Sequence, residues 1–561
     1  MLLRAKFNSL RRSRKSHPSL KGMPQVSSLL RSLRMADLLP VCSIFFALGL
    51  LTNCGSTMQQ PPPPPVGDFS LSASPTQINA TLGATSPAIQ LSVTALQGFT
   101  GTVSISFSGL PAGATTTPAS PFTITAGASQ SFTVSIPESS AAGMYSIQAK
   151  GTSGTLSHTQ QVGMALNPSV SPTVTTTDDG TLFVLQTQTA TDTVRIGLLK
   201  AWGAAIIEVS LNGVDYVNND DPGRQIQTSL WDANASYSPD WGYNPIESGD
   251  HFFNGSPVLA FTLLSDSIYT KTQPIQWAPE NFGGGPSSPV LGDAYIEKWI
   301  SVVPGFNRVF RVHYKITHFG TDLQADAFQE APVMYVNPNV PNFSYYGGGS
   351  PWTGDTLSQH TMSFNCCDML ATTELWGAYV DNNSTGIAVY TPQQFPNSKG
   401  FNAGSTLQFT PMCPYTWEPG GILEFDTFVL VGNVNEMRAA IYALHNPQTS
   451  QSTLPPMGNP DSPSNGDVLT GTASVEGWAW ALPGMSSVQV FVDGNLVGTA
   501  NYNLSRPDIP VAFPRAPSDV GYQYSLDTTA FANGSHAIVV KATDNNSHVA
   551  TFATRTVTIN N

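Results

Sequence analysis

Two neighbouring stretches of the chain concentrate side chains that could hold or process a sugar. DDPGRQIQTSLWD covers residues 220–232, and WGYNPIESGDH covers residues 241–251. Aromatic faces cover the apolar C–H side of a sugar ring, while amide, guanidinium and carboxylate groups hold its hydroxyls. A Glu close to a His also offers a general acid and a general base near physiological pH. The residue types in these stretches are therefore compatible both with sugar binding and with acid–base catalysis.

From these stretches we predict ligand contacts and an acid–base pair. The predicted contacts are Arg224, Gln227, Trp231, Trp241 and Asn244. Glu247 and His251 are the predicted catalytic pair. The structural alternative is a turn begun by Asn-Pro, in which Glu247 and Asp250 bond to the loop backbone and His251 lies on the surface.

Further candidates come from three later stretches. Trp352 lies in FSYYGGGSPWTGD (343–355), where aromatics around three glycines could form one wall of a groove. Glu374 and Trp376 in TELWGAYV alternate on an expected strand and so share a face. Glu330 could place a catalytic carboxylate opposite Glu247, as hydrolysis of a glycosidic bond requires. The alternatives are an ordinary loop pinned by its aromatics and buried, ion-paired glutamates.

Several classes of function are not supported. The chain contains no HExxH, GxSxG, Walker or dinucleotide-binding motif, so we predict neither a cofactor nor a metal site. The formal net charge of −13 would repel a polyanion, which argues against nucleic acid as a partner.

The amino-terminal segment has the layout of an export signal. Basic residues without any acidic one precede Met35, and the apolar run Leu38–Leu51 follows. The sequence LTNC ending at Cys54 resembles a bacterial lipobox, which implies acylation of Cys54. We therefore predict a signal at 1–54, a proline-rich linker at 55–67, and a protein exported and lipid-anchored to the bacterial cell envelope at its surface. Cleavage without lipidation and an uncleaved anchor are the alternatives.

The cysteines agree with an oxidising compartment. Beyond the signal the chain has Cys366, Cys367 and Cys413, and no CxxC pair that would suggest zinc. One of the adjacent pair could form a disulfide with Cys413. Buried free thiols are the alternative.

Two segments have the alternation of short strands that is typical of β-sandwiches. In 68–167 the runs AIQLSVTAL and QSFTVSIP are separated by turn residues, and in 464–561 a hairpin is expected at Asp493-Gly494. Phrases such as GLPAGAT and VEGWAWALPG resemble bacterial immunoglobulin-like modules. We read the first segment as a spacer.

The segment 171–447 between them is also rich in strand-like runs, with one helix expected after Asn435. Its length suits two broad sheets stacked face to face. The segment resembles the galactose-mutarotase-like supersandwich in two runs, VRIGLLKAWGAAIIEVSLNGVDYVNNDDPGRQIQ and FQEAPVMYVNPNV. That resemblance implies an Arg224 on a strand that faces a concave groove. The expected fold class is thus all-β, with a supersandwich between two immunoglobulin-like sandwiches.

These observations favour carbohydrate as the partner of the middle segment. The first hypothesis is a protein that binds a carbohydrate. Whether it also processes that carbohydrate is left open by the sequence. The second is a polysaccharide lyase, glycoside hydrolase or sugar epimerase that uses Glu247 and His251. The third is a structural adhesin without a small ligand.

Overall fold

The computed structural model describes most of the chain beyond the amino-terminal segment. The described residues are 67–220, 222–232, 243–321, 324–326, 329–364, 366–413, 415–445, 456–481, 483–512, 516–552 and 554–561. The predicted signal with Cys54, the proline run at 61–65 and the predicted contact Trp241 lie outside these residues.

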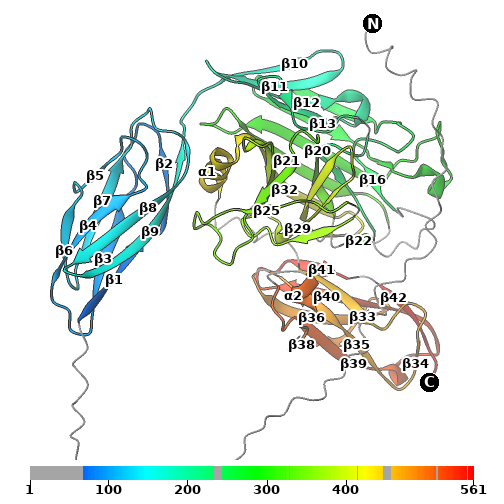
Figure 1. Cartoon of the computed structure of the whole chain (residues 1–561). Helices are drawn as coiled ribbons and strands as arrows, with labels where there is room; N and C mark the ends of the chain where they lie inside the picture. Colours follow the sequence, from blue (N-terminus) through cyan, green and yellow to red (C-terminus); the bar gives the residue numbers. More distant parts are fainter. Residues whose placement is uncertain are drawn as a thin grey trace, which may run out of the picture. The chain divides into compact units, whose positions relative to one another are not determined.

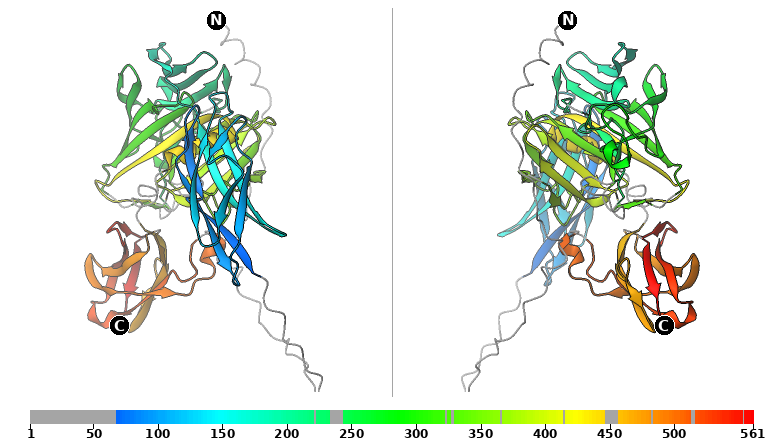
Figure 2. Two further views of the ribbon diagram at one scale, coloured as in Figure 1. Left: turned by 90° about the vertical axis from the view of Figure 1, so that its left-hand side faces the viewer. Right: turned by 90° about the vertical axis from the view of Figure 1, so that its right-hand side faces the viewer.

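The first part, which we call the N-terminal sandwich, consists of two sheets (Figure 1). The four-stranded sheet contains, in spatial order, β1 (Asp68–Ser74), β3 (Ile89–Leu96), β7 (Ser129–Ser135) and β5 (Thr115–Thr117). The five-stranded sheet contains β2 (Gln77–Thr81), β9 (Leu156–Asn167), β8 (Gly143–Ser153), β4 (Thr102–Ser108) and β6 (Phe122–Thr125). In both views of Figure 2 these strands run along the length of the sandwich.

Alternation of side chains explains how the N-terminal sandwich closes. In β3 the residues Ile89, Leu91 and Val93 are buried, whereas the residues between them point away from the core. Because successive side chains of a strand point to opposite faces, one apolar face per sheet suffices for the core between them.

The last part, which we call the C-terminal sandwich, again has two sheets. The first contains β33 (Met457–Ser462), β35 (Thr472–Trp480), β39 (Gly521–Asp527) and β38 (Asn501–Leu504). The second contains β34 (Val468–Leu469), β42 (Arg555–Ile559), β40 (Gly534–Asp544), β36 (Met485–Val492) and β37 (Asn495–Thr499), with β41 (Val549–Thr551) paired to β40. The hairpin at Asp493-Gly494 is confirmed, since both residues have positive φ, 49° and 79°, as a tight two-residue turn requires.

Between them in the sequence lies the central unit, which is built on two large sheets (Figure 1). The seven-stranded sheet contains β19 (Ile275–Gln276), β16 (Pro245–Ile246), β15 (Gln227–Ser229), β23 (Glu330–Val336), β30 (Leu407–Met412), β29 (Phe395–Asn402) and β26 (Asp368–Leu370). The nine-stranded sheet contains β17 (Val258–Leu263), β18 (Ser267–Thr272), β20 (Ala294–Val302), β21 (Val309–His318), β32 (Ile422–Asn433), β28 (Thr385–Tyr390), β27 (Trp376–Val380), β24 (Asn342–Tyr345) and β25 (Ser358–His360).

Smaller elements complete the central unit and the C-terminal sandwich. A five-stranded sheet contains β10 (Thr173–Asp178), β11 (Leu182–Gln188), β12 (Thr193–Leu199), β13 (Ala205–Leu211) and β14 (Val214–Asp215). β22 (Gln324–Asp326) pairs with β31 (Tyr415–Trp417). The helical elements are η2 (Lys200–Trp202), η3 (Pro279–Phe282), α1 (Val434–Leu444), α2 (Ile509–Ala512) and η4 (Thr528–Ala530).

One apolar core joins the two large sheets of the central unit. Phe409 of β30 and Met334 of β23 belong to the same buried cluster as Phe310 of β21 and Val429 of β32. The seven-stranded sheet therefore has its inner face on the core, and its other face is available for a groove. The predicted all-β sandwich class is confirmed.

The predicted helix is α1, and it covers the outer face of the nine-stranded sheet. Met437 and Ile441 of α1 pack with Trp376 of β27 and Leu430 of β32. The helix begins after Asn433, whose side chain accepts a hydrogen bond from the backbone N–H of Asn435. The nine-stranded sheet is thus buried on both faces where α1 lies over it.

Candidate functional site

A groove of about 480 Å³ opens on the free face of the seven-stranded sheet. Five aromatic side chains line it: Trp231, Trp277, Tyr335, Phe364 and Phe401. Six polar or charged side chains line it as well: Arg224, Asn244, Glu330, Lys399, Asn402 and Gln408. Its volume is within the range of about 300–1,000 Å³ that is typical of ligand sites. Of the predicted contacts, Arg224, Trp231, Asn244 and Glu330 therefore come together.

Arg224 reaches the groove from a loop. The resemblance implied a strand, but β14 ends at Asp215 and β15 begins at Gln227, so Arg224 lies between them. The preceding Gly223 has φ +89°, and a Cβ at this position would lie 2.4 Å from the Trp277 ring. The glycine thus lets the Trp277 ring pack against this loop, next to Arg224.

Trp231 and Asn244 are held by hydrogen bonds around the end of β15. The side chain of Gln329 accepts from the backbone N–H of Trp231 at 2.7 Å and donates to its carbonyl at 2.8 Å. The Asn244 side chain accepts from the hydroxyl of Ser229, and its backbone N–H donates to the Gln276 side chain at 3.0 Å. These bonds hold the backbone of Trp231 and both the backbone and the side chain of Asn244 in place.

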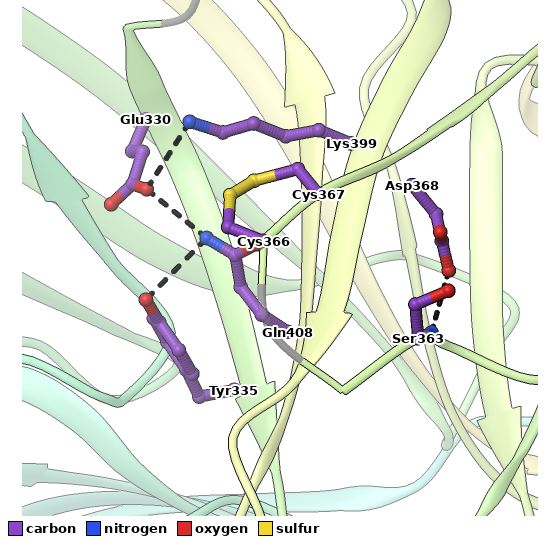
Figure 3. The surroundings of a disulfide bond; sticks show 8 residues. All are labelled: Glu330, Tyr335, Ser363, Cys366, Cys367, Asp368, Lys399 and Gln408. Atoms are coloured by element: carbon purple, nitrogen blue, oxygen red, sulfur yellow. Dashed lines mark hydrogen bonds and ion pairs between the residues drawn. A yellow bond between two sulfur atoms is a disulfide. The ribbon is translucent and has the colours of Figure 1, made fainter. Parts of the chain in front are cut away.

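Glu330 belongs to a polar network on the floor of the groove, drawn in Figure 3. Its Oε1 lies 3.7 Å from the Lys399 Nζ and accepts from the Gln408 Nε2 at 3.1 Å. The same Nε2 lies 3.4 Å from the Tyr335 hydroxyl. The side chains of Glu330 and Lys399 are 8% and 17% exposed, so the ion pair is partly shielded from water but still borders the groove.

Glu247, the first predicted catalytic residue, lies elsewhere. Its side chain is fully buried and forms an ion pair with Lys298, which also donates to the Ala204 carbonyl at 2.6 Å. The backbone N–H of Thr228 donates to its other oxygen at 2.9 Å. Glu247 is not among the described groove residues, because Lys298 on the inner face of β20 holds its carboxylate in the core.

His251, the second member of the predicted pair, lies behind the groove wall. Its Nε2 is 2.9 Å from the Glu280 carboxylate, and its ring packs 5.8 Å from the Trp277 ring, centroid to centroid. The predicted Glu247–His251 pair therefore does not form in the structure, since each partner is bound to another residue. Gln227 is also buried, below the groove surface, where its Oε1 accepts from the Ser248 N–H at 3.1 Å.

The predicted contacts Trp352, Glu374 and Trp376 lie under α1, on the other side of the core. Glu374 accepts from Trp352 N–H at 3.1 Å, from Trp376 Nε1 at 3.0 Å and from Arg438 Nη2 at 2.8 Å. Burial alone would lower the pKa of Arg438, but Glu374 outweighs it and the pKa is raised. We call this group, together with Tyr442 and His445, the α1 cluster. It is placed to anchor the helix to the sheet, away from the groove.

The disulfide also differs from the prediction. Cys366 bonds to its neighbour Cys367, and Cys413 is free and buried (Figure 3). Burial raises the pKa of the Cys413 thiol to about 12. The predicted pairing with Cys413 does not form, because Cys413 lies in the core whereas Cys366 borders the groove.

Tyr335 lines the groove but was not predicted from the sequence, because it comes from an irregular strand. Glu330 and Tyr335 are five positions apart, and regular alternation would place them on opposite faces. In the structure, Gln227–Ser229 of β15 faces Val333–Glu330 of β23, so β23 contains one extra residue. This bulge brings Tyr335 to the groove side. The alternation of Lys399 and Phe401 on β29 was a signal that could have been used.

A second cavity, of about 330 Å³, lies beside α1. Its charged side chains are already joined to one another, since Arg308 pairs with Asp192 at 2.9 Å and with Glu436 at 2.8 Å. Within the described ranges, no cluster of three His, Cys, Asp or Glu residues could hold a metal ion, and no helix is long and apolar enough to cross a membrane. The groove is therefore the better candidate for a ligand site.

Comparison with known proteins gives one family match. Residues 459–540, in the C-terminal sandwich, match the family described as a bacterial Ig domain, which confirms the predicted resemblance for that part. No curated protein matches the chain.

Solved structures with some similarity include three carbohydrate-active proteins. A polysaccharide lyase has 8% identity and a TM-score of 0.28, covering 67% of this chain and 47% of that one. An α-galactosidase from Lactobacillus brevis has 11% identity and 0.29, with 52% and 44% covered. A 4-alpha-glucanotransferase from Thermococcus litoralis has 12% identity and 0.28, with 46% and 40% covered. This chain spans less than half of each, and such scores carry no argument about its activity.

Proposed function

We propose that the central unit binds a carbohydrate in the groove of the seven-stranded sheet. The observation that carries this proposal is that aromatic rings alternate there with groups that hold hydroxyls. Trp231 and Trp277 can cover the C–H face of a sugar ring, and Asn244 and Gln408 can bond to its hydroxyls. This mixture is typical of sugar sites and unusual for a purely apolar ligand.

The charges of the groove favour an acidic sugar. Arg224 and Lys399 carry positive charge, and Glu330 is the one carboxylate among the described lining residues. An otherwise acidic chain therefore presents an excess of positive charge in its groove. Guanidinium and ammonium groups bind carboxylates through charge-assisted hydrogen bonds. We therefore propose a uronic-acid-containing glycan as the ligand class.

Binding is better supported than hydrolysis. Hydrolysis of a glycoside commonly needs two carboxyl groups on either side of the scissile bond. Glu330 borders the groove, but Glu247 is fixed to Lys298 in the core. A structural adhesin without a small ligand would not explain why Arg224, Trp277 and Lys399 line the same groove.

A lyase is the second candidate function. The Tyr335 hydroxyl borders the same groove as Arg224 and Lys399. Proton abstraction next to a uronic carboxylate needs a base and cations that stabilise the developing charge. Incubation with polyuronates, followed by absorbance of unsaturated products, tests it. Loss of that activity in Tyr335→Phe with retained binding would assign the chemistry to Tyr335.

A glycan array that includes neutral and uronic-acid oligosaccharides tests the binding proposal. We expect wild-type protein to bind acidic glycans, and Arg224→Ala or Trp277→Ala to weaken binding by about tenfold or more. Trp299→Ala is the matched control, because Trp299 is a 38%-exposed tryptophan on the outer face of the nine-stranded sheet. Failure of the wild type to bind any glycan, or equal binding by all the variants, would refute the proposal.

We also propose that the protein is exported and anchored by a lipid on Cys54. The support is the order of basic residues, apolar run and lipobox-like LTNC in the sequence. Metabolic labelling with a fatty acid tests this proposal: wild type should incorporate label and Cys54→Ala should not. Label in neither protein would favour cleavage without lipidation.

A further inference from the structure

Arg224 is the one partly exposed residue in an otherwise buried run. From Pro222 to Leu230 every other residue is buried, and the run continues directly into β15. Arg224 lines the groove, and so does the half-buried Trp277. The interior of the central unit therefore fixes the backbone that carries Arg224, and the position of its side chain in the groove depends on buried contacts.

Ser248 supplies one of these buried contacts. Its Oγ accepts a hydrogen bond from the backbone N–H of Gly223, the residue before Arg224, at 2.7 Å, and Ser248 is fully buried. Ser248 is itself held on both sides: its N–H donates to Gln227 Oε1 at 3.1 Å, and its carbonyl accepts from the Ser256 N–H at 3.0 Å. Because a buried N–H without an acceptor is costly, the Ser248 hydroxyl defines the favoured position of the Gly223 backbone.

The same glycine lies against the ring of Trp277, since a Cβ on Gly223 would come within 2.4 Å of that ring. Trp277 is fixed separately: its N–H donates to the Asn244 carbonyl at 2.9 Å, and its carbonyl accepts from the His251 N–H at 3.2 Å. The bond to Ser248 therefore holds Gly223 beside a ring whose backbone is anchored elsewhere, and Arg224 follows one residue later. A cation and an aromatic face thus start from adjoining points of the groove wall.

We infer that Ser248 is a positioning residue for a subsite that holds one uronic acid residue, with the C–H face of the sugar on Trp277 and its carboxylate on Arg224. This inference rests on the proposed carbohydrate function. A guanidinium binds a carboxylate through two parallel hydrogen bonds and therefore needs a defined orientation. Ser248 is not among the described residues that line the groove, so it acts on the ligand through Gly223 and Arg224. Stacking on Trp277 needs no contribution from Ser248, because Trp277 has backbone bonds of its own.

The test measures how strongly the groove prefers an acid to its ester. Calorimetry compares an oligogalacturonate with its methyl ester, which keeps the ring and the hydroxyls but has no charge. If the array identifies another acidic glycan as the best ligand, that glycan and its methyl ester take their place. We expect Ser248→Ala to lower the ratio of the two affinities by about tenfold, because Arg224 is no longer held in place for the carboxylate. The affinity for the methyl ester should change by less than about twofold.

A double-variant cycle distinguishes positioning from a general loss of structure. If Ser248 acts through Arg224, then Ser248→Ala should not lower the ratio further in protein that already carries Arg224→Ala. Ser256→Ala is the matched control, because Ser256 is also buried and its Oγ accepts from the Ile275 N–H at 3.0 Å and donates to the Ile246 carbonyl at 2.9 Å. This variant should keep the wild-type ratio. An equal fall in Ser256→Ala, or a further fall in the double variant, would overturn the inference.

The remaining outcomes separate this inference from the proposed function. Ser248→Cys, whose thiol has a similar shape and is a weaker acceptor, serves where Ser248→Ala does not fold, and it should lower the ratio in the same direction. A wild-type ratio in the folded Ser248 variant, while Arg224→Ala loses its preference for the acid, would overturn the inference and leave the carbohydrate site intact. Equal affinity of the wild type for acid and ester would also overturn the inference. Absence of glycan binding by the wild type would overturn both the inference and the proposed function.

Discussion

The groove and the α1 cluster contain the same residue types but have opposite surroundings. In the groove, Glu330 pairs with Lys399 near Trp277, and these two charged side chains are 8% and 17% exposed. In the α1 cluster, Glu374 pairs with Arg438 near Trp376, and the charged side chains are 0% and 4% exposed. A tryptophan, a glutamate and a cation in proximity therefore do not by themselves indicate a ligand site.

The two regions differ in whether another element covers the outer face of the sheet. Helix α1 packs its apolar side on the outer face of the nine-stranded sheet and closes the space over Glu374. Hydrogen bonds from Trp352, Trp376, Arg438 and Tyr442 then satisfy both carboxylate oxygens. The seven-stranded sheet leaves a volume of about 480 Å³ beside Glu330. Buried charges that are fully paired stabilise one arrangement of the chain, whereas charges beside an open volume can meet a ligand.

The largest expected effect is on stability, from Arg438→Met. The substitution leaves Glu374 buried without its cation, which costs about 3–5 kcal/mol of unfolding free energy. Urea denaturation measures this loss. Lys399→Met is the matched change in the groove, and its destabilisation should be smaller, because Glu330 keeps its hydrogen bond from Gln408 and borders the open groove. Equal losses in the two variants would contradict the contrast between the regions.

An intermediate effect is expected from His445 when the pH falls. Burial lowers the pKa of His445 to about 4, and its ring stacks on Trp352 at 3.6 Å. The unfolded chain takes up a proton near its ordinary pKa of about 6.5, before the folded chain does. Stability is therefore fully present above pH ~6.5 and is lost as the pH falls toward ~4, by about 2 kcal/mol.

The variant His445→Gln checks the assignment of this pH dependence. Gln does not titrate, so the difference in unfolding free energy between pH 7 and pH 4 should shrink by about 2 kcal/mol relative to the wild type. Thermal or urea unfolding at the two pH values measures the difference. An unchanged pH dependence would show that other groups dominate it and that the α1 cluster is not the sensitive region.

The smallest expected effect on stability comes from Glu330→Gln. The amide keeps the shape of the carboxylate and can still accept from Gln408, so we expect a change below about 1 kcal/mol. In contrast, the affinity for an acidic glycan should increase, because the groove loses its negative charge and Lys399 is released from its ion pair. Weaker binding of acidic glycans would indicate that Glu330 holds sugar hydroxyls directly.

The sequence was sufficient for the regular parts of the fold. Alternation predicted strands such as β3 and β21, Asp493-Gly494 predicted a hairpin, and the apolar spacing after Asn435 predicted α1. These features depend on neighbours within a few residues. Local chemistry also indicated the stretch that carries Arg224, Trp231 and Asn244, which the structure brings into one groove.

Contacts between distant segments could not be predicted in the same way. Glu247 is paired with Lys298, 51 positions away, and Glu374 with Arg438, 64 positions away. No local pattern distinguishes these buried glutamates from Glu330. The bulge in β23 that turns Tyr335 toward the groove depends on its pairing with β15, more than a hundred positions earlier in the chain.

The sequence by itself determined that this protein consists of strands with apolar and polar faces, and that sugar-compatible side chains occur near residues 220–251. Only the tertiary structure decided which of the two large sheets is covered by α1 and which faces a groove. The physical reason is that a side chain's type sets what it can bond to, whereas its access to a ligand depends on which distant segment packs over it.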